Sequence, residues 1–139
     1  MVHALRRAGQ RLPAGGSLIS IRPHRTWRPV VSIHTPSRRA PVAQLINSAF
    51  DSRLSAAEAA LARVVQEGRF TLAGVRNHRY RAGLDNLSQL RTYLELISPP
   101  RPRFPAGGRA RLLELWGLRP RGSKIEITES IVVTALRRA

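Results

Sequence analysis

Residues 54–68 read LSAAEAALARVVQEG, and this stretch decides the predicted fold. Ser55 and Glu58 have the spacing of a capping box, in which the serine oxygen accepts a backbone N–H bond and the glutamate reaches back. Gly68 is a typical residue for the end of a helix. An apolar stripe at helical spacing would be formed by Leu54, Leu61, Val64 and Val65. We therefore expect a helix over residues 55–67.

A second helix is predicted over residues 85–97. Its apolar face would consist of Leu84, Leu87, Leu90, Leu94 and Ile97. The two prolines at residues 99 and 100 would end this helix, because proline disfavours helical backbone in the residue before it. We also expect a short helix around residues 42–50. Residues 42–98, which contain no proline, thus form a predicted helical region with two antiparallel main helices joined through residues 69–83.

Residues 1–41 are predicted to be a basic, targeting-like segment that continues as an extended arm. The segment opens with MVHALRRAGQRL, which is rich in arginine and free of acids, as is typical of a mitochondrial targeting peptide. A basic arm without a targeting role is the alternative interpretation. Five prolines between residues 13 and 41 favour extended backbone.

Three short features stand out in this arm. The runs SLISI at residues 17–21 and VVSI at residues 30–33 are apolar enough to pair as edge strands. Trp27, with Arg25 and Arg28 beside it, is a candidate for insertion into a partner, because aromatic and arginine side chains are enriched at interfaces.

Residues 99–139 are predicted to be a second arm, rich in proline and arginine. Four prolines between residues 99 and 105 make its start stiff and extended. A helical turn over residues 112–118 would present Trp116. Residues 124–128 alternate between polar and apolar side chains, which predicts a short strand.

The fold class that follows is mainly α, with a small helical hairpin and long extended arms at both ends. Hydrophobic residues make up 42% of the 139 residues, but only 5% are aromatic and many are alanine. Alanine buries little surface, and short chains are marginal in stability even with a full core. We therefore expect no independent large core, and expect part of the chain to be buried against other proteins.

Charge indicates the kind of partner. The chain has 24 basic and 8 acidic residues, a net charge of +16, and Lys124 is its one lysine. A field of this size attracts polyanions. Arginine favours planar, bidentate contacts to phosphate or carboxylate. RNA, anionic lipid headgroups and the acidic surface of another protein are the candidate partners.

The sequence contains no arrangement of residues that is typical of a catalytic, metal or cofactor site. The chain has no cysteine, which excludes thiolate ligation of zinc or iron–sulfur clusters. No second histidine or carboxylate stands at ligand spacing from His3, His24, His34 or His78. Paired carboxylates, phosphate-binding loops and nucleophile elbows are also missing. We expect no enzyme activity, no metal and no cofactor, and no apolar run reaches the roughly 18 residues of a membrane span.

One pattern in the last third of the chain is similar to a known family. It consists of Leu90-Arg91, Tyr93, Pro99-Pro100, residues 102–112 (PRFPAGGRARL), Trp116, the turn at residues 119–122 and Ser130-Ile131-Val132. In this order the residues resemble accessory subunit seven of the alpha subcomplex of mitochondrial NADH:ubiquinone oxidoreductase (complex I). The resemblance covers roughly residues 87–133. Gly117 departs from the family, which tends to a second aromatic there.

The resemblance implies a non-catalytic structural subunit of the respiratory chain at the mitochondrial inner membrane, on the matrix side. It would brace the quinone-reducing module of complex I, take no part in electron transport itself and hold no redox cofactor. Its partners would be core subunits of that module and cardiolipin headgroups. The implied partner-binding residues are Pro99, Pro100, Arg101, Pro102, Arg103, Phe104, Pro105, Gly107, Gly108, Arg109, Arg111, Leu112, Trp116, Arg119, Arg121 and Gly122.

Within this set, the resemblance implies that Phe104, Leu112 and Trp116 are anchors buried in the partner, and that the arginines pair with acidic surfaces or headgroups. Two alternatives share the same composition. One is a mitochondrial ribosomal protein that binds rRNA through phosphate contacts. The other is an accessory subunit of a different inner-membrane complex, such as ATP synthase.

Overall fold

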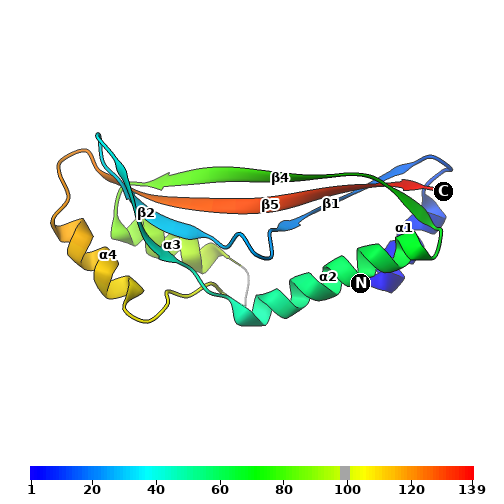
Figure 1. The fold of residues 1–139 in the computed structure, drawn as a ribbon, viewed down its shortest axis with the longest axis horizontal. Helices are drawn as coiled ribbons and strands as arrows, with labels where there is room; N and C mark the ends of the chain where they lie inside the picture. Colours follow the sequence, from blue (N-terminus) through cyan, green and yellow to red (C-terminus); the bar gives the residue numbers. More distant parts are fainter. Residues whose placement is uncertain (98–100) are drawn as a thin grey trace. The chain divides into compact units, whose positions relative to one another are not determined.

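The structure, a computed structural model, describes residues 1–97 and 101–139 and contains four helices and five strands in these ranges (Figure 1). In chain order the elements are α1 (Val2–Arg11), β1 (Ser17–Pro23), β2 (Val30–His34), β3 (Arg39–Gln44), α2 (Ser48–Gln66), β4 (Phe70–Leu84), α3 (Leu87–Leu96), α4 (Gly108–Gly117) and β5 (Lys124–Arg138). The strands form one antiparallel sheet. The chain is therefore a mixed α/β protein, and the prediction of a mainly α chain is wrong.

The chain forms two compact units, each assembled from segments that are distant in sequence. Unit 1 consists of residues 1–25, 50–78 and 131–139, and unit 2 of residues 26–49 and 79–130. Strands β4 and β5 each contribute residues to both units.

Unit 1 pairs β1 with the last part of β5, from Ser17 opposite Arg137 to Pro23 opposite Ile131. Its core packs these strands against the helices α1 and α2. The fully buried members are Leu61, Val64, Phe70 and Leu136. Gly9 of α1 lies so close to the Phe70 ring that a Cβ there would be 3.1 Å from it. The basic first segment is therefore helix α1, and its apolar side chains Val2 and Leu5 pack against this core.

Unit 2 packs α3 and α4 against one face of a sheet in which β2 lies between β5 and β3. Ile33 of β2 is opposite Ile125 of β5, and both are buried. The buried core consists of Val31, Ile33, Leu45, Leu90, Leu112, Trp116, Ile125 and Ile127. Asn86 caps α3 by accepting the Gln89 N–H at 2.9 Å. The expected helix at residues 85–97 is confirmed to within two residues.

The predicted helical hairpin is wrong. The linker expected over residues 69–83 is strand β4, and the apolar faces of α2 and α3 pack in the cores of different units. Helix α2 also begins at Ser48, so Ser55 lies inside it and does not cap it. Glu58, taken as the other half of the capping box, lies 3.3 Å from Arg25 and 3.8 Å from Arg22. The short helix expected over residues 42–50 is replaced by the end of β3 and the start of α2.

The two predicted arms are not extended tails. Residues 1–41 supply α1, β1, β2 and the first half of β3, and VVSI is a central strand, not an edge. Residues 101–139 supply α4 and β5, and the strand expected over residues 124–128 continues to Arg138. The chain also has two apolar cores of its own, contrary to the expectation that it has no independent large core.

The central position of β5 makes its buried side chains critical for stability. Ile127 has no exposed surface, and we expect Ile127→Ala to lower the free energy of unfolding by about 2–5 kcal/mol. Leu118→Ala is the control, because Leu118 is 77% exposed and should change the value by less than about 0.5 kcal/mol. Urea unfolding followed by tryptophan fluorescence measures this, since Trp27 and Trp116 both belong to unit 2. Equal effects of the two substitutions would contradict the assigned core.

Unit 1 also contains a carboxylate surrounded by arginines. Glu67, at the end of α2, forms ion pairs with Arg6 of α1, with Arg63 at 3.1 Å and with Arg69 at 3.3 Å. Hydrogen bonding to Arg6 is the main cause that lowers the pKa of Glu67 from 4.5 to about 2. This contact joins the first helix of the chain to the end of the second.

A carboxylate whose pKa is lower in the folded than in the unfolded chain stabilises the fold fully at pH values above its pKa in the unfolded chain. This stabilisation is lost as the pH falls through its pKa in the folded chain. We therefore expect Glu67→Gln to lower the melting temperature at pH values above 4.5, and this difference to shrink as the pH falls toward 2. Circular dichroism melts of both proteins across this range measure it. A difference that does not vary with pH would show that the charge of Glu67 is not what stabilises unit 1.

Candidate nucleic-acid interface

The sheet of unit 2 has a polar face on the side opposite α3 and α4. Opposed side chains of antiparallel strands share a face, so the register of β2 defines this surface. Ser32 is opposite Glu126 of β5 and Pro41 of β3. The next row along β2 joins Val30 to Thr128 of β5 and Gln44 of β3. Short polar side chains therefore form much of the floor.

The walls of this surface come from β4 and from the segment before β2. Thr26, Trp27 and Arg28 flank the floor, and Arg79, Tyr80 and Arg81 of β4 also contribute. Together with the floor they enclose an open hollow of about 620 Å³, which we call the sheet groove. The Arg79 guanidinium stacks over the Trp27 ring, 4.4 Å from its centroid. Such stacking holds a guanidinium in a fixed plane while its N–H donors point outward.

Glu126 is the acidic residue beneath the sheet groove. Its side chain is 10% exposed, and its Oε1 accepts from Arg39 Nε at 2.7 Å while its Oε2 accepts from Arg39 Nη2 at 3.1 Å. Arg81 Nε lies 3.8 Å from the same carboxylate. One carboxylate thus offsets part of the charge of two arginines and fixes their orientation. With Arg28 and Arg79, the groove keeps an excess of positive charge.

Tyr80 is held in place by a carboxylate below it. Its hydroxyl donates to Glu129 at 3.1 Å, and Tyr93 of α3 donates to the other oxygen of Glu129 at 2.7 Å. Burial is the main cause that raises the pKa of both tyrosines, and the nearby Glu129 charge raises it further. Both hydroxyls therefore stay protonated and keep donating. Because Arg79 and Arg81 point to the groove side of β4, the Tyr80 ring between them lies on the opposite face of the strand, beside Tyr93 of α3.

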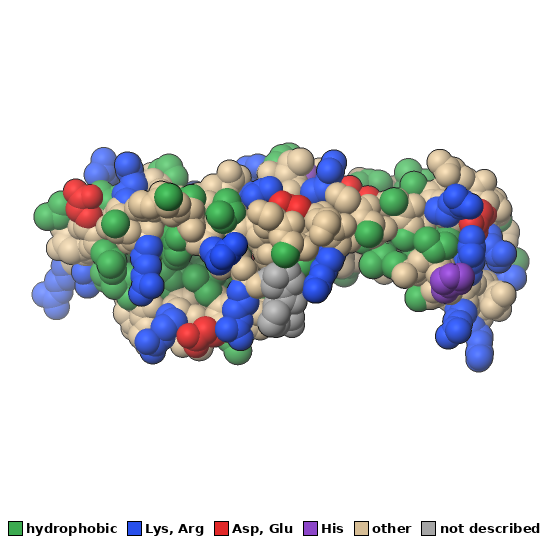
Figure 2. Space-filling model, turned by 90° about the horizontal axis from the view of Figure 1, so that it is seen from below, with side chains coloured by type: hydrophobic (Ala, Val, Ile, Leu, Met, Phe, Trp, Pro, Cys, Tyr) green, Lys and Arg blue, Asp and Glu red, His purple; other side chains and the backbone are tan. Residues whose placement is uncertain are grey.

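This arrangement suits the binding of a polyanion that has flat, apolar parts. Guanidinium groups bind phosphate oxygens in pairs of parallel hydrogen bonds, and tryptophan rings stack with nucleobases. On the face shown in Figure 2, too, arginine side chains far outnumber carboxylates. Phosphate contacts along a strand of nucleic acid need such an excess of positive charge.

The residues that the sequence selected as partner-binding lie elsewhere in unit 2. Pro99 and Pro100 are outside the described residues. Arg101, Pro102, Phe104, Arg109 and Leu112 line a second groove between α3 and α4. The turn that begins α4 contains Pro105, Gly107 and Gly108, and Gly107 has φ +74°. The exposed residues are Arg103, Arg111, Arg119, Arg121 and Gly122.

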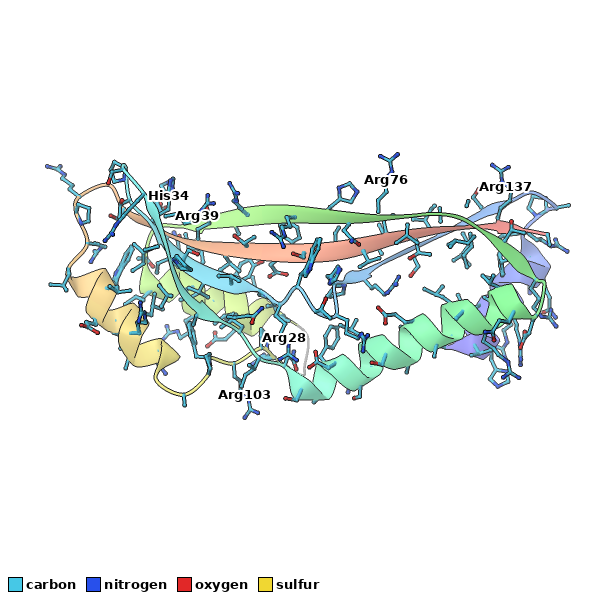
Figure 3. The ribbon with its side chains drawn as sticks, viewed as in Figure 1. Arg28, His34, Arg39, Arg76, Arg103 and Arg137 are labelled. Atoms are coloured by element: carbon cyan, nitrogen blue, oxygen red, sulfur yellow. The ribbon has the colours of Figure 1, made fainter. Side chains whose placement is uncertain are left out.

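The three implied anchors contact this chain itself. Leu112 and Trp116 are buried in the core of unit 2, and Phe104 packs against that core half-buried. Arg119 stacks over the Trp116 ring at 3.8 Å. The main chain of Arg103 exchanges two 2.8 Å hydrogen bonds with Ile46, and its side chain points away from the sheet (Figure 3). The selected residues therefore belong to a folded unit and do not form an extended arm.

The sequence analysis found part of the sheet groove and missed the rest. Trp27 and Arg28 were singled out, but Arg39, the run at residues 79–81 and Glu126 were not. The run RNHRYR at residues 76–81 interleaves arginine with an aromatic residue, a pattern common in nucleic-acid-binding surfaces, and it could have drawn attention. The pairing of Glu126 with Arg39 depends on strand register, which the sequence does not contain.

No known protein family, curated protein or solved structure matches the chain. In the described ranges, no three histidines, aspartates or glutamates come together as metal ligands. Nor does any helix of residues 1–97 or 101–139 combine the length and apolarity needed to cross a membrane. A functional conclusion must therefore come from the chain's own surfaces, of which the sheet groove is the most basic and the most aromatic.

The ion pair beneath the groove can be tested by its effect on stability. Glu126→Gln keeps the shape of the side chain but removes the charge that Arg39 and Arg81 face, so we expect the free energy of unfolding to fall by about 1–3 kcal/mol. Glu95→Gln is the matched control. Glu95 is 57% exposed and 4.0 Å from Arg91, and its loss should change stability by less than about 1 kcal/mol. Urea titration of both variants gives the comparison, and equal losses would contradict the role of Glu126.

Proposed function

We propose that the chain is a non-catalytic protein that binds single-stranded nucleic acid in the sheet groove of unit 2. The observation that carries the proposal is the stacked pair of Arg79 and Trp27 in a groove that also holds Arg28 and Arg39. Stacking platforms in a basic groove are the common feature of proteins that bind single strands with little sequence preference.

The geometry assigns separate roles to the groove residues. Arg28, Arg39 and Arg79 would contact phosphates, whereas the Trp27 ring would stack with a base. Glu126 would keep Arg39 and Arg81 extended across the floor. A double helix fits less well, because its bases are stacked internally and cannot reach aromatic rings on a sheet.

This proposal corresponds most closely to the interpretation of the chain as an RNA-binding component of a mitochondrial ribosome. The arginine-rich helix α1 is compatible with the prediction of a mitochondrial targeting segment. The complex I prediction depended on an extended arm along core subunits. Residues 101–122 instead form a bridge to Ile46, helix α4 and a turn, so that mechanism has less support than groove binding.

The proposal predicts binding that depends on salt and on particular arginines. We expect a fluorescein-labelled oligouridine of about 12 nucleotides to bind the full chain, with an affinity that falls steeply as salt rises. Arg79→Gln should weaken binding about three- to tenfold and reduce the slope of log affinity against log salt by about 0.7, the value for one phosphate contact on a single strand. Fluorescence anisotropy at several salt concentrations measures both quantities.

The control must carry the same charge change outside the groove, because any protein of net charge +16 attracts nucleic acid without a specific site. Arg103→Gln meets this condition, since its side chain points away from the sheet (Figure 3). Trp27→Ala, which removes the stacking ring and no charge, should weaken binding about fivefold or more and leave the salt slope unchanged. If Arg103→Gln weakens binding as much as Arg79→Gln, the groove is not the site. An oligothymidine of equal length shows whether the 2′-hydroxyl contributes.

A further inference from the structure

A second groove in unit 2 differs in chemistry from the sheet groove. It lies between α3 and α4, and it has a volume of about 570 Å³. Its apolar lining consists of Leu87, Leu90, Leu94, Phe104, Leu112 and Leu113. Leu90 and Leu112 are buried and form the floor, whereas Leu113 is 49% exposed at the edge. We call it the helix groove. A hollow of this size, with an apolar lining and charged groups at its edge, has the usual character of a small-molecule site.

Three arginines stand around this apolar lining. Arg91 comes from α3, Arg101 from the segment before α4, and Arg109 from the first turn of α4. Arg91 lies 4.0 Å from Glu95, and both side chains are mainly exposed. Arg101 and Arg109 form no ion pair with any residue of the described ranges. Two guanidinium groups with free donors therefore lie at the mouth of a leucine-lined groove.

We propose that the helix groove binds a single-chain amphiphile with an anionic headgroup, namely a long-chain fatty acid. The acyl chain would lie along the leucines and Phe104. Its carboxylate would accept hydrogen bonds from Arg101 and Arg109, for which the planar guanidinium is the best match among side chains.

The surroundings of the groove select against other small ligands. A cationic amphiphile would meet three guanidinium groups and one carboxylate, a net repulsion. A neutral one would leave the guanidinium groups without a partner. A nucleic acid bound in the helix groove would have to place hydrated phosphates against apolar side chains, which is unfavourable. In Figure 2, which shows the molecule from the side of the helices, apolar side chains are exposed next to arginines. The proposal is independent of nucleic-acid binding, because none of its residues lines the sheet groove.

The test is isothermal titration calorimetry of the full chain with dodecanoate, kept below the concentration at which it forms micelles. We expect one dodecanoate per chain. Arg101→Gln combined with Arg109→Gln should weaken binding about tenfold or more, because both headgroup contacts are lost. Arg111→Gln is the matched control for Arg109→Gln alone: each removes one positive charge from α4, but Arg111 does not line the groove. Its affinity should equal that of the unchanged protein.

Two further measurements separate the acyl contact from the charge contact. Ser88→Trp places a large ring at the edge of the groove and should abolish binding while circular dichroism shows an unchanged fold. Dodecyltrimethylammonium, with the same chain and the opposite charge, should not bind. The proposal is overturned if dodecanoate does not bind, if the cationic amphiphile binds equally well, or if Arg111→Gln weakens binding as much as Arg109→Gln. Binding only to anionic vesicles, without binding of dodecanoate, would also overturn it and identify a membrane contact instead.

Discussion

Everything else in the structure depends on the backbone pairing of β5. Its first part pairs with β2 through residues 124–128, its last part pairs with β1 through residues 131–137, and β4 pairs with it as well. A strand that is paired on both edges cannot shift without breaking two ladders of hydrogen bonds. This fixes Glu126 and Thr128 on the polar face and Ile125 and Ile127 on the core face. The sheet groove and the core of unit 2 are therefore two consequences of one register.

That register also explains how the chain tolerates so much positive charge. A carboxylate with little access to water is costly unless it is paired and hydrogen-bonded. Glu126 meets this condition through Arg39 and Arg81, and Glu67 meets it through Arg6, Arg63 and Arg69. Each carboxylate organises several arginines, so a few acids are enough to bring together segments that would otherwise repel one another.

The helices could be predicted from the sequence to a useful degree, because a stripe of leucines at helical spacing is a local signal. Helix α3 and the end of α2 at Gly68 are examples, and Gly68 indeed has φ +67°. Three strands were predicted in part, at residues 17–21, 30–33 and 124–128, but β3 and β4 were missed. In β5 the buried residues are Ile125 and Ile127 but then Ser130 and Val132, so the alternation changes phase within the strand. In β4, residues 71–81 are all exposed and carry no alternation at all. Such a strand forms only because a distant neighbour pairs with it, and the groove that it lines was hidden for the same reason.

The two grooves of unit 2 lie on different layers, yet one carboxylate connects the elements that form them. Glu129 of β5 accepts a hydrogen bond from Tyr80 of β4 and another from Tyr93 of α3. Leu94, the next residue of that helix, lines the helix groove. A buried, charge-assisted hydrogen bond is stronger than a neutral one and resists displacement. A movement of α3 would therefore have to stretch the Tyr93 bond or carry Glu129 with it, and the Tyr80 ring depends on the same carboxylate. Glu129 thus connects β4, β5 and α3 within unit 2.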